Sequence, residues 1–85
     1  MTTVYYTSHF EKRIKKYKHL KGKIEKKIAN FRENPFNRSL KTHRLSGELK
    51  NYYSFSIEKN IRIMFSFESK NKVTFVDIGT HDVYK

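Results

Sequence analysis

The stretch NYYSFSIEKNIRIMFSF, residues 51–67, decides how the rest of this chain can fold. Apolar and polar residues alternate on both sides of Glu58-Lys59-Asn60, a pattern that predicts two β-strands joined by a tight turn. A third strand is predicted from Val73 to Ile78, with Gly79 as the point where the chain leaves the sheet. The three strands form an antiparallel meander with one apolar face, and that face requires a second layer to cover it.

The residues before this meander predict the covering layer. Val4-Tyr5-Tyr6 favours a first strand, and Ser8 as N-cap with Glu11 three residues later predicts the start of a helix. Apolar residues then recur at helical spacing in two segments, separated by a break near Lys18 to Gly22 and ended by Asn34-Pro35. The sequence leaves open whether Gly22 belongs to the connection or to the second helix. Residues 36–40 form a loop in this prediction, and residues 41–49 lead from it toward the sheet.

These elements together predict an α+β fold in two layers, with an N-terminal strand, an antiparallel helical hairpin and an antiparallel sheet of three further strands. The chain has 85 residues and no cysteine, so we predict a single domain, residues 1–85, held together by apolar packing without disulfides. No apolar run reaches the length of a membrane span, and the first residues lack the layout of a signal peptide. We therefore expect a cytoplasmic protein that does not contact a membrane.

The charge of the chain is strongly positive. Nineteen lysines and arginines against eight acidic residues give a formal net charge of +11, and such a field attracts polyanions, of which nucleic acid is the commonest in a cytosol. Many of these cations lie on the outer faces of the predicted helices. That pattern is typical both of a solvated helix face and of a footprint for RNA phosphates, and it would also suit an acidic protein partner.

Strand alternation gives Arg62 a distinct position. The apolar residues of its strand would face the helices, so Arg62 and Met64 point to the other, partly open face of the sheet. Arg62 is there either an ordinary exposed arginine or part of a site for an anion. Among the histidines, His9 and His19 are predicted to be solvated surface residues. Few possible ligands cluster at metal-binding spacing, so we expect no metal site.

Three short motifs follow one another along the chain. They are His43-Arg44-Leu45-Ser46-Gly47 ahead of the hairpin, Asn60-Ile61-Arg62-Ile63-Met64-Phe65 within it, and Gly79-Thr80-His81 after the last strand. Their order and spacing, behind a basic helical hairpin, resemble the RelE/ParE superfamily of bacterial toxin-antitoxin toxins. Within that superfamily the chain looks closest to the YafQ and YoeB branches of ribosome-dependent mRNA endonucleases.

The resemblance implies a fold, an activity and a set of partners. The fold would be RelE-like, of the microbial RNase type, and the activity would be that of an endoribonuclease that cuts mRNA in the decoding site of the 70S ribosome. The resemblance implies no metal and no cofactor. It also implies an acidic antitoxin that wraps and silences the toxin, in a complex that binds operator DNA through the antitoxin.

The resemblance also assigns roles to particular residues. His43 and His81 take the positions of catalytic residues, and Arg62 that of a phosphate-binding arginine. Cleavage by the 2′-hydroxyl of RNA needs a base, a cationic group for the charged transition state and an acid, which we expect to be His43, Arg62 and His81 in that order. Four further residues are candidates for RNA binding or support: Lys41, Arg44, Asp82 and Tyr84.

Two positions depart from the pattern of the YafQ branch, which has a further histidine and an aspartate on the middle hairpin. Ser56 and Asn60 stand there in this chain, and neither can act as a base at neutral pH. Either the protein works with the reduced set of two histidines and one arginine, or Asp82 or Glu58 substitutes, or the activity has drifted.

Two other functions compete with the nuclease. The first is a gyrase inhibitor like ParE, which is a protein-binding toxin without an acid and base, and the presence of His43, Arg62 and His81 counts against it. The second is a basic nucleic-acid-binding module without turnover, which the charge alone would support.

Overall fold

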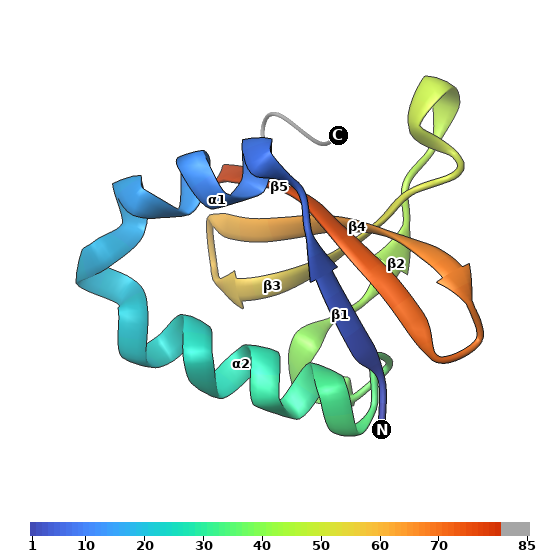
Figure 1. Cartoon of the computed structure of the whole chain (residues 1–85), viewed down its shortest axis with the longest axis horizontal. Helices are drawn as coiled ribbons and strands as arrows, with labels where there is room; N and C mark the ends of the chain where they lie inside the picture. Colours follow the sequence, from blue (N-terminus) through green and yellow to red (C-terminus); the bar gives the residue numbers. More distant parts are fainter. Residues whose placement is uncertain (81–85) are drawn as a thin grey trace.

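A computed structural model of the chain describes residues 1–80. One five-stranded sheet, with the strand order β1-β5-β4-β3-β2, forms one layer (Figure 1). Its strands are β1 (Thr3–Tyr6), β2 (His43–Arg44), β3 (Tyr53–Glu58), β4 (Ile61–Ser69) and β5 (Lys72–Thr80). The helices are α1 (Ser8–Ile14) and α2 (Lys21–Glu33), and short 3-10 helices span Lys15–Leu20 (η1), Arg38–Leu40 (η2) and Gly47–Leu49 (η3). The predicted α+β architecture in two layers is confirmed.

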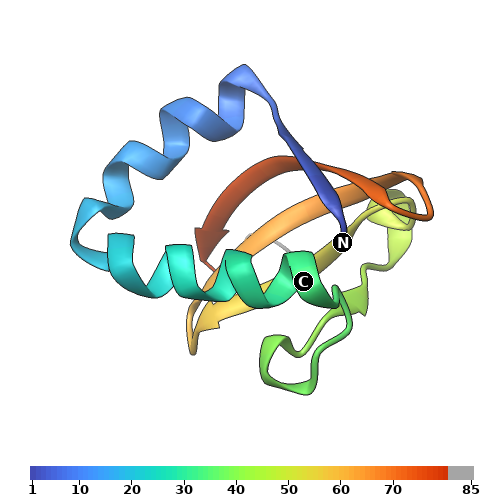
Figure 2. The same ribbon diagram turned by 60° about the horizontal axis from the view of Figure 1, so that its bottom comes forward.

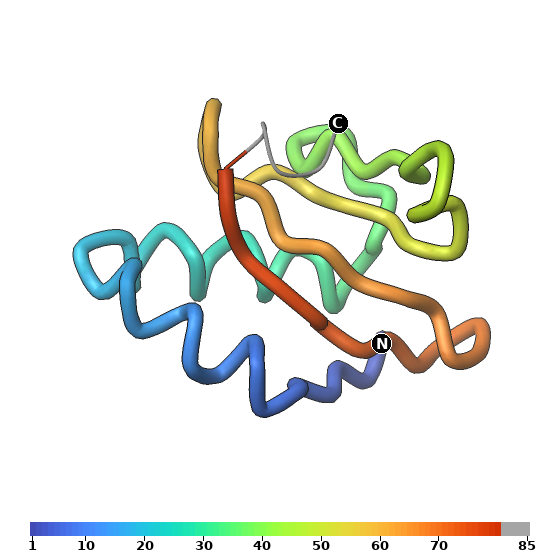
Figure 3. The backbone as a smooth tube through the Cα atoms, turned by 90° about the horizontal axis from the view of Figure 1, so that it is seen from above, coloured from blue at the N-terminus to red at the C-terminus, as the bar shows by residue number. Residues whose placement is uncertain are grey.

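The sheet is mixed. β1 pairs with β5 in parallel, while β5, β4, β3 and β2 pair with one another antiparallel. Figure 3 shows β5 in red, β4 in orange and β3 in yellow, following one another across the sheet. The N-terminal strand therefore joins the sheet beside the last of the described strands.

Two details of the predicted sheet were wrong. Residues His43 and Arg44 form the edge strand β2, although we expected them to lead toward the sheet without joining it. Two paired residues are too short to produce a recognisable alternation in the sequence. The last strand also continues through Gly79, because Gly79 pairs with Arg62 and Thr80 pairs with Ile61. The ladder of β4 thus holds the glycine in the strand.

The start of α1 also differs from the prediction. Thr7, and not Ser8, is the N-cap, since Thr7 has extended backbone angles and its Oγ1 accepts a hydrogen bond of 3.0 Å from the backbone N–H of Phe10. Thr7 Oγ1 also donates to the carbonyl of Val76 on β5, at 3.4 Å. Both neighbouring residue types are good caps. The choice follows from the contact with β5.

Replacing Thr7 with alanine should lower the free energy of unfolding by about 1 kcal/mol, the usual effect of losing an N-cap. Ser8→Ala is the matched control, because Ser8 is exposed and should change stability by no more than about 0.5 kcal/mol. Urea unfolding followed by circular dichroism measures both. A larger loss in Ser8→Ala than in Thr7→Ala would contradict this cap assignment.

The connection between the helices begins earlier than predicted. Tyr17 has φ −114° and ψ 30°, which interrupts the helical geometry within η1. Gly22, which the sequence left open, lies in the first turn of α2. The two helices thus meet at a bend and both reach the same face of the sheet, as Figure 2 shows for α2 in teal and green.

The core lies between the helices and the sheet and is built largely of phenylalanine. Phe31 of α2 is 0% exposed and sits at its centre. Its ring centroid lies 4.7 Å from that of Phe55, 4.9 Å from that of Phe65 and 5.2 Å from that of Phe75. Three adjacent strands are therefore packed against one side chain of the helix layer. Both helices pack on this one face of the sheet, and the candidate site is sought on the opposite face.

Candidate functional site

The face of the sheet away from the helices carries the residues predicted to act. Residues paired across neighbouring strands share a face, and two such rows run across it. The first row consists of His43, Ser54 and Met64, and the second of Ser56, Arg62 and Gly79. His43 and Arg62 are two strands apart across the sheet and two residues apart along it, which places their backbones about 12 Å apart at ordinary strand spacing. A nucleotide bound on this face can therefore contact both side chains.

The serines of these rows are more buried than an open face would suggest. Ser54 is 0% exposed and Ser56 is 8% exposed, although both alternate with the core residues of β3. Longer side chains stand opposite them in register, namely His43 and Met64 beside Ser54 and Arg62 beside Ser56. The small serines therefore form the floor of the face.

The contact of His43 with the backbone determines which of its nitrogens is protonated. The imidazole is exposed, and its Nδ1 lies 3.1 Å from the carbonyl oxygen of Lys41. A carbonyl oxygen only accepts hydrogen bonds, so Nδ1 must carry the proton. In the neutral ring Nε2 then has a free lone pair. His43 is thereby arranged to accept a proton at Nε2.

Arg62 combines burial with unused donors. Its Nε and Nη1 atoms are buried, and neither has a hydrogen-bond partner within residues 1–80. Unpaired buried polar atoms are rare in folded proteins because they cost free energy. A guanidinium group binds the oxygens of a carboxylate or phosphate through such N–H groups. The site around Arg62 is therefore suited to an anion.

A polar hollow of about 550 Å³ lies next to Arg62. Its lining comes from α2, the segment around η2, β3, the turn after it and β4: Lys27, Ser39, Lys41, Ser56, Ile57, Glu58, Lys59 and Arg62. Four of these residues are cationic and one is acidic. The acidic one, Glu58, lies 3.2 Å from the ammonium of Lys23. The hollow therefore carries a positive field.

Two of the predicted supporting residues, Lys41 and Arg44, lie on different sides of the sheet relative to Arg62. Lys41 has a left-handed backbone (φ 52°) and lines the hollow with Arg62. Arg44 follows His43 in β2, so alternation directs it to the opposite face, and its Nε donates to the carbonyl of Lys50. Lys41 is thus brought together with Arg62, and Arg44 is not.

Three predicted residues, His81, Asp82 and Tyr84, lie outside the described residues. Their roles stay predictions.

The sequence profile of one protein family, described as the bacterial toxin of type II toxin-antitoxin systems, YafQ, matches residues 2–84. The chain belongs to this YafQ toxin family. No significant match was found among curated protein sequences. The membership accounts for nearly the whole chain.

Solved structures share the fold of this YafQ-family toxin at low sequence identity. YafQ from E. coli BL21(DE3) superimposes with a TM-score of 0.79 at 18% identity, covering 98% of this chain and 97% of that one. YafQ in the E. coli DinJ-YafQ toxin-antitoxin complex gives 0.77 at 18%, covering 96% and 94%. A YoeB/ParE toxin from Agrobacterium tumefaciens gives 0.76 at 19%, covering 94% and 99%. The predicted RelE-like fold is confirmed.

This YafQ-family toxin departs from the expected pattern at Ser56 and Asn60, and Glu58 is the nearby residue that could substitute for them. Ser56 Oγ donates a hydrogen bond of 2.9 Å to the backbone carbonyl of Glu58. The Glu58 carboxylate is paired with Lys23. Asn60 lies in the exposed turn between β3 and β4. Ser56 and Asn60 therefore supply no base at these positions, and the carboxylate of Glu58 is already paired.

The sequence alone does not single out two cations of the hollow. Lys27 is one of many cations on the outer faces of the predicted helices, and Lys59 lies in the predicted turn. The position of Lys27 depends on how α2 packs over β3, which no local pattern reveals. The sequence could have indicated Lys59, because this residue lies in a tight turn three residues before Arg62.

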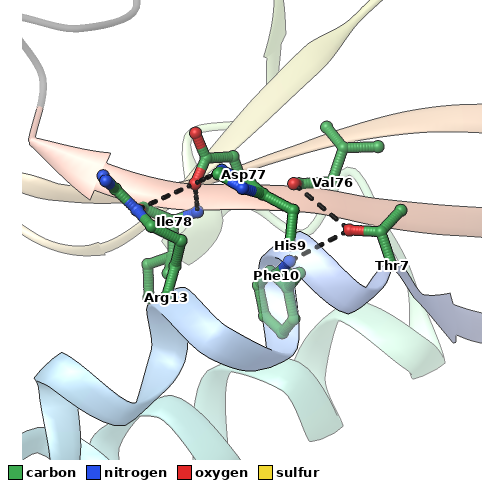
Figure 4. A network of polar contacts seen from close by, with 7 residues as sticks. All are labelled: Thr7, His9, Phe10, Arg13, Val76, Asp77 and Ile78. Carbon is green, nitrogen blue, oxygen red and sulfur yellow. Dashed lines mark hydrogen bonds and ion pairs between the residues drawn. The ribbon is translucent and has the colours of Figure 1, made fainter.

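A cluster of polar contacts fixes β5 to α1 in this toxin (Figure 4). Asp77 Oδ1 lies 3.3 Å from Arg13 Nε and 3.2 Å from His9 Nε2, and it accepts a hydrogen bond of 2.8 Å from the N–H of Ile78. Arg13 Nη2 also donates to the carbonyl of Ile78, at 3.3 Å. The side chain of His9 is 61% exposed, as predicted, and that of Asp77 is 17% exposed. Arg13 and Asp77 therefore anchor the end of β5 from which the chain continues toward residue 81.

Residues 1–80 contain no group of three histidine, cysteine, aspartate or glutamate side chains able to hold a metal ion. No helix within these residues is long and apolar enough to cross a membrane.

Proposed function

We propose that this toxin is a ribosome-dependent endoribonuclease that cleaves mRNA during translation. The observation that carries the proposal is the guanidinium of the half-buried Arg62, whose Nε and Nη1 are buried and have no partner within residues 1–80. It shares a face of the sheet with His43 and adjoins a hollow lined by lysines. Such an arrangement suits a phosphate flanked by a base.

The proposed reaction uses the attack of an RNA 2′-hydroxyl on the neighbouring phosphorus. His43 Nε2 takes the proton of the 2′-hydroxyl, and Arg62 stabilises the charge that develops on the phosphate oxygens. His81 donates a proton to the departing 5′-oxygen. Lys41, Asp82 and Tyr84 would support RNA binding. Arg44 would contribute to RNA binding only from the opposite face of β2. A protein group serves each step, so the proposal includes no metal and no cofactor.

The experiment that tests this function is inducible expression in a bacterium, followed by mapping of mRNA 5′ ends. Cuts in phase with the reading frame, with 5′-hydroxyl and 2′,3′-cyclic or 3′-phosphate ends, are the expected result. A 5′-phosphate at the cut would contradict the mechanism. Inhibition of gyrase supercoiling without mRNA cuts would instead identify a ParE-like toxin. RNA binding without either activity would identify a non-catalytic module.

His43→Ala should lower the rate of mRNA cleavage by about 100-fold or more, because the general base is lost. His19→Ala is a suitable control, since His19 is exposed on η1 and has no place in the proposed site. Single-turnover cleavage of ribosome-bound mRNA measures both variants. An unchanged rate in His43→Ala would remove this histidine from the mechanism.

We further propose an acidic antitoxin as the protein partner. A groove of about 770 Å³ lies between α1, η1, α2 and β1, and its floor includes Tyr5, Tyr6 and Phe10. Four lysines, Lys12, Lys15, Lys18 and Lys21, line it together with Glu11 and Glu25. An amphipathic acidic helix would match both the apolar floor and the basic rim. E. coli YafQ has been crystallised with its antitoxin DinJ, in line with such a partner.

The remaining parts of the proposal concern the setting in which the toxin acts. Residues 1–85 would act as one domain in the cytoplasm. The toxin-antitoxin complex would bind operator DNA through the antitoxin. Co-purification of an acidic protein encoded beside the toxin gene, with relief of growth arrest, is the expected result. Failure of any neighbouring gene product to bind would contradict the partner.

A further inference from the structure

The hollow beside Arg62 is larger than a single scissile phosphate requires. Its volume of about 550 Å³ falls within the range of pockets that hold a small organic ligand. Its cations come from four separate segments: Lys27 from α2, Lys41 after η2, Lys59 from the β3–β4 turn and Arg62 from β4. Like charges that converge from four segments repel one another unless an anion lies between them. The packing of the fold thus prepares a place for negative charge.

Two bonds hold the walls of the hollow in position. Lys27 Nζ donates to the backbone carbonyl of Ser39, at 3.3 Å, which joins α2 to η2. Lys23 Nζ lies 3.2 Å from Glu58 Oε1, which joins α2 to the end of β3. The second contact also offsets the negative charge of Glu58. An ammonium has three N–H donors, so Lys27 can still bind an anion together with Lys41, Lys59 and Arg62.

The composition of the hollow indicates which part of a nucleic acid it would take. Among the lining residues within 1–80, only Ile57 is apolar, and none has an aromatic side chain on which a base could stack. Bases are bound by stacking or through their edges, whereas lysines bind phosphates without regard to sequence. The hollow is therefore suited to the sugar-phosphate backbone.

We propose that the hollow binds the phosphodiester next to the scissile one on the same RNA strand, with Lys27 and Lys59 as its principal contacts. The proposal rests on the proposed function for the position of the scissile phosphate at Arg62. Lys41 stands between the two phosphates. The site thus recognises a run of RNA backbone that continues from the sheet face toward α2.

The test compares RNA binding by the Lys27→Gln/Lys59→Gln variant and by the unaltered full-length toxin. The probes are two single-stranded hexanucleotides of different sequence, fully 2′-O-methylated so that they cannot be cleaved, with affinity measured by fluorescence anisotropy over a range of salt. We expect the Kd to rise about 10-fold or more for both sequences. The slope of log K against log salt should fall by about 0.7 for one lost phosphate contact on a single strand.

A second double variant, Lys16→Gln/Lys70→Gln, provides the matched control. It removes the same charge from exposed lysines of η1 and the β4–β5 turn, outside the hollow. We expect a change in Kd of less than about 2-fold at physiological salt, where exposed charges farther apart than about 8 Å are screened. Equal losses in the two double variants, a loss confined to one sequence, or no binding by the unaltered toxin would overturn the proposal. Weakened antitoxin binding with unchanged RNA binding would assign the hollow to the protein partner instead.

Failure of the proposed phosphate subsite can be distinguished from failure of the proposed nuclease activity. If the toxin cuts no mRNA but the Lys27/Lys59 variant binds the probes more weakly, the backbone subsite stands and the nuclease assignment falls. If mRNA is cut and the variant binds RNA with unchanged affinity and salt slope, the subsite falls and the nuclease assignment stands. Thermal unfolding of both double variants verifies that each is folded.

Discussion

Replacing Arg62 with alanine should lower the rate of mRNA cleavage by about 100-fold or more, without making the fold less stable. The loss of rate follows from removing the group that stabilises charge on the scissile phosphate. Arg62→Lys should restore only part of the rate, because an ammonium cannot form the paired N–H contacts of a planar guanidinium. Single-turnover cleavage of ribosome-bound mRNA measures all three proteins.

The stability of Arg62 variants provides an independent readout. Arg62 Nε and Nη1 are buried without partners within residues 1–80, and a buried donor that has no partner costs free energy in the folded state. Arg62→Met keeps the aliphatic bulk without the donors, and we expect it to raise the free energy of unfolding by about 1 kcal/mol. Arg32→Ala, an exposed arginine at the end of α2, is the control and should alter neither cleavage nor stability appreciably. A destabilised Arg62→Met would show that Arg62 serves the fold, and full cleavage by Arg62→Ala would remove Arg62 from the mechanism.

Phe31→Ala should destabilise the protein by about 3–5 kcal/mol, as expected when a fully buried phenylalanine is removed. The reason is that this one ring contacts Phe55, Phe65 and Phe75, each on a different strand, so its loss leaves a cavity where the two layers meet. Small domains are stable by only about 5–15 kcal/mol, and this change would consume much of that margin. Urea unfolding followed by circular dichroism measures the loss.

Phe36→Ala is the matched control for Phe31→Ala. Its ring is 56% exposed and packs only at the edge of the core, 6.2 Å from Tyr53 and 6.0 Å from Phe67 by ring centroids. We expect a loss of about 1 kcal/mol or less. Similar losses in the two variants would mean that the core has no dominant centre.

The parts of the fold that could be predicted are those with a repeated pattern. Residues 51–67 alternate over two strands, and the helical segments repeat apolar positions over several turns, so each contains many consistent signals. β2 has only two residues, and Gly79 is held in β5 by its partner Arg62, so neither leaves a local signal. Likewise, Thr7 and Ser8 are both suitable caps, and only the contact of Thr7 with β5 distinguishes them.

The residues of the candidate site also differ in whether a local sequence pattern indicates their position. Arg62 was placed on the correct face because alternation alone fixes the side to which a strand residue points. The resemblance to a toxin family drew attention to His43, and the bond of its Nδ1 to the Lys41 carbonyl then defined its tautomer. Lys27 could not be placed, because its position depends on the packing of α2 against β3, which is a tertiary property.

The pairing of β1 with β5 has a consequence for the synthesis of the toxin. Thr3, Val4, Tyr5 and Tyr6 find their partners at Lys72, Val73, Thr74 and Phe75, and Thr7 bonds to Val76, 69 residues later. A growing chain therefore emerges with its first strand unpaired and keeps it so until β5 has been translated. The strand β5, which lies between β1 and β4, also leads toward residue 81. The sheet that carries His43 and Arg62 is therefore completed late in synthesis, and we expect a nascent chain to lack the proposed nuclease activity until β5 has been translated.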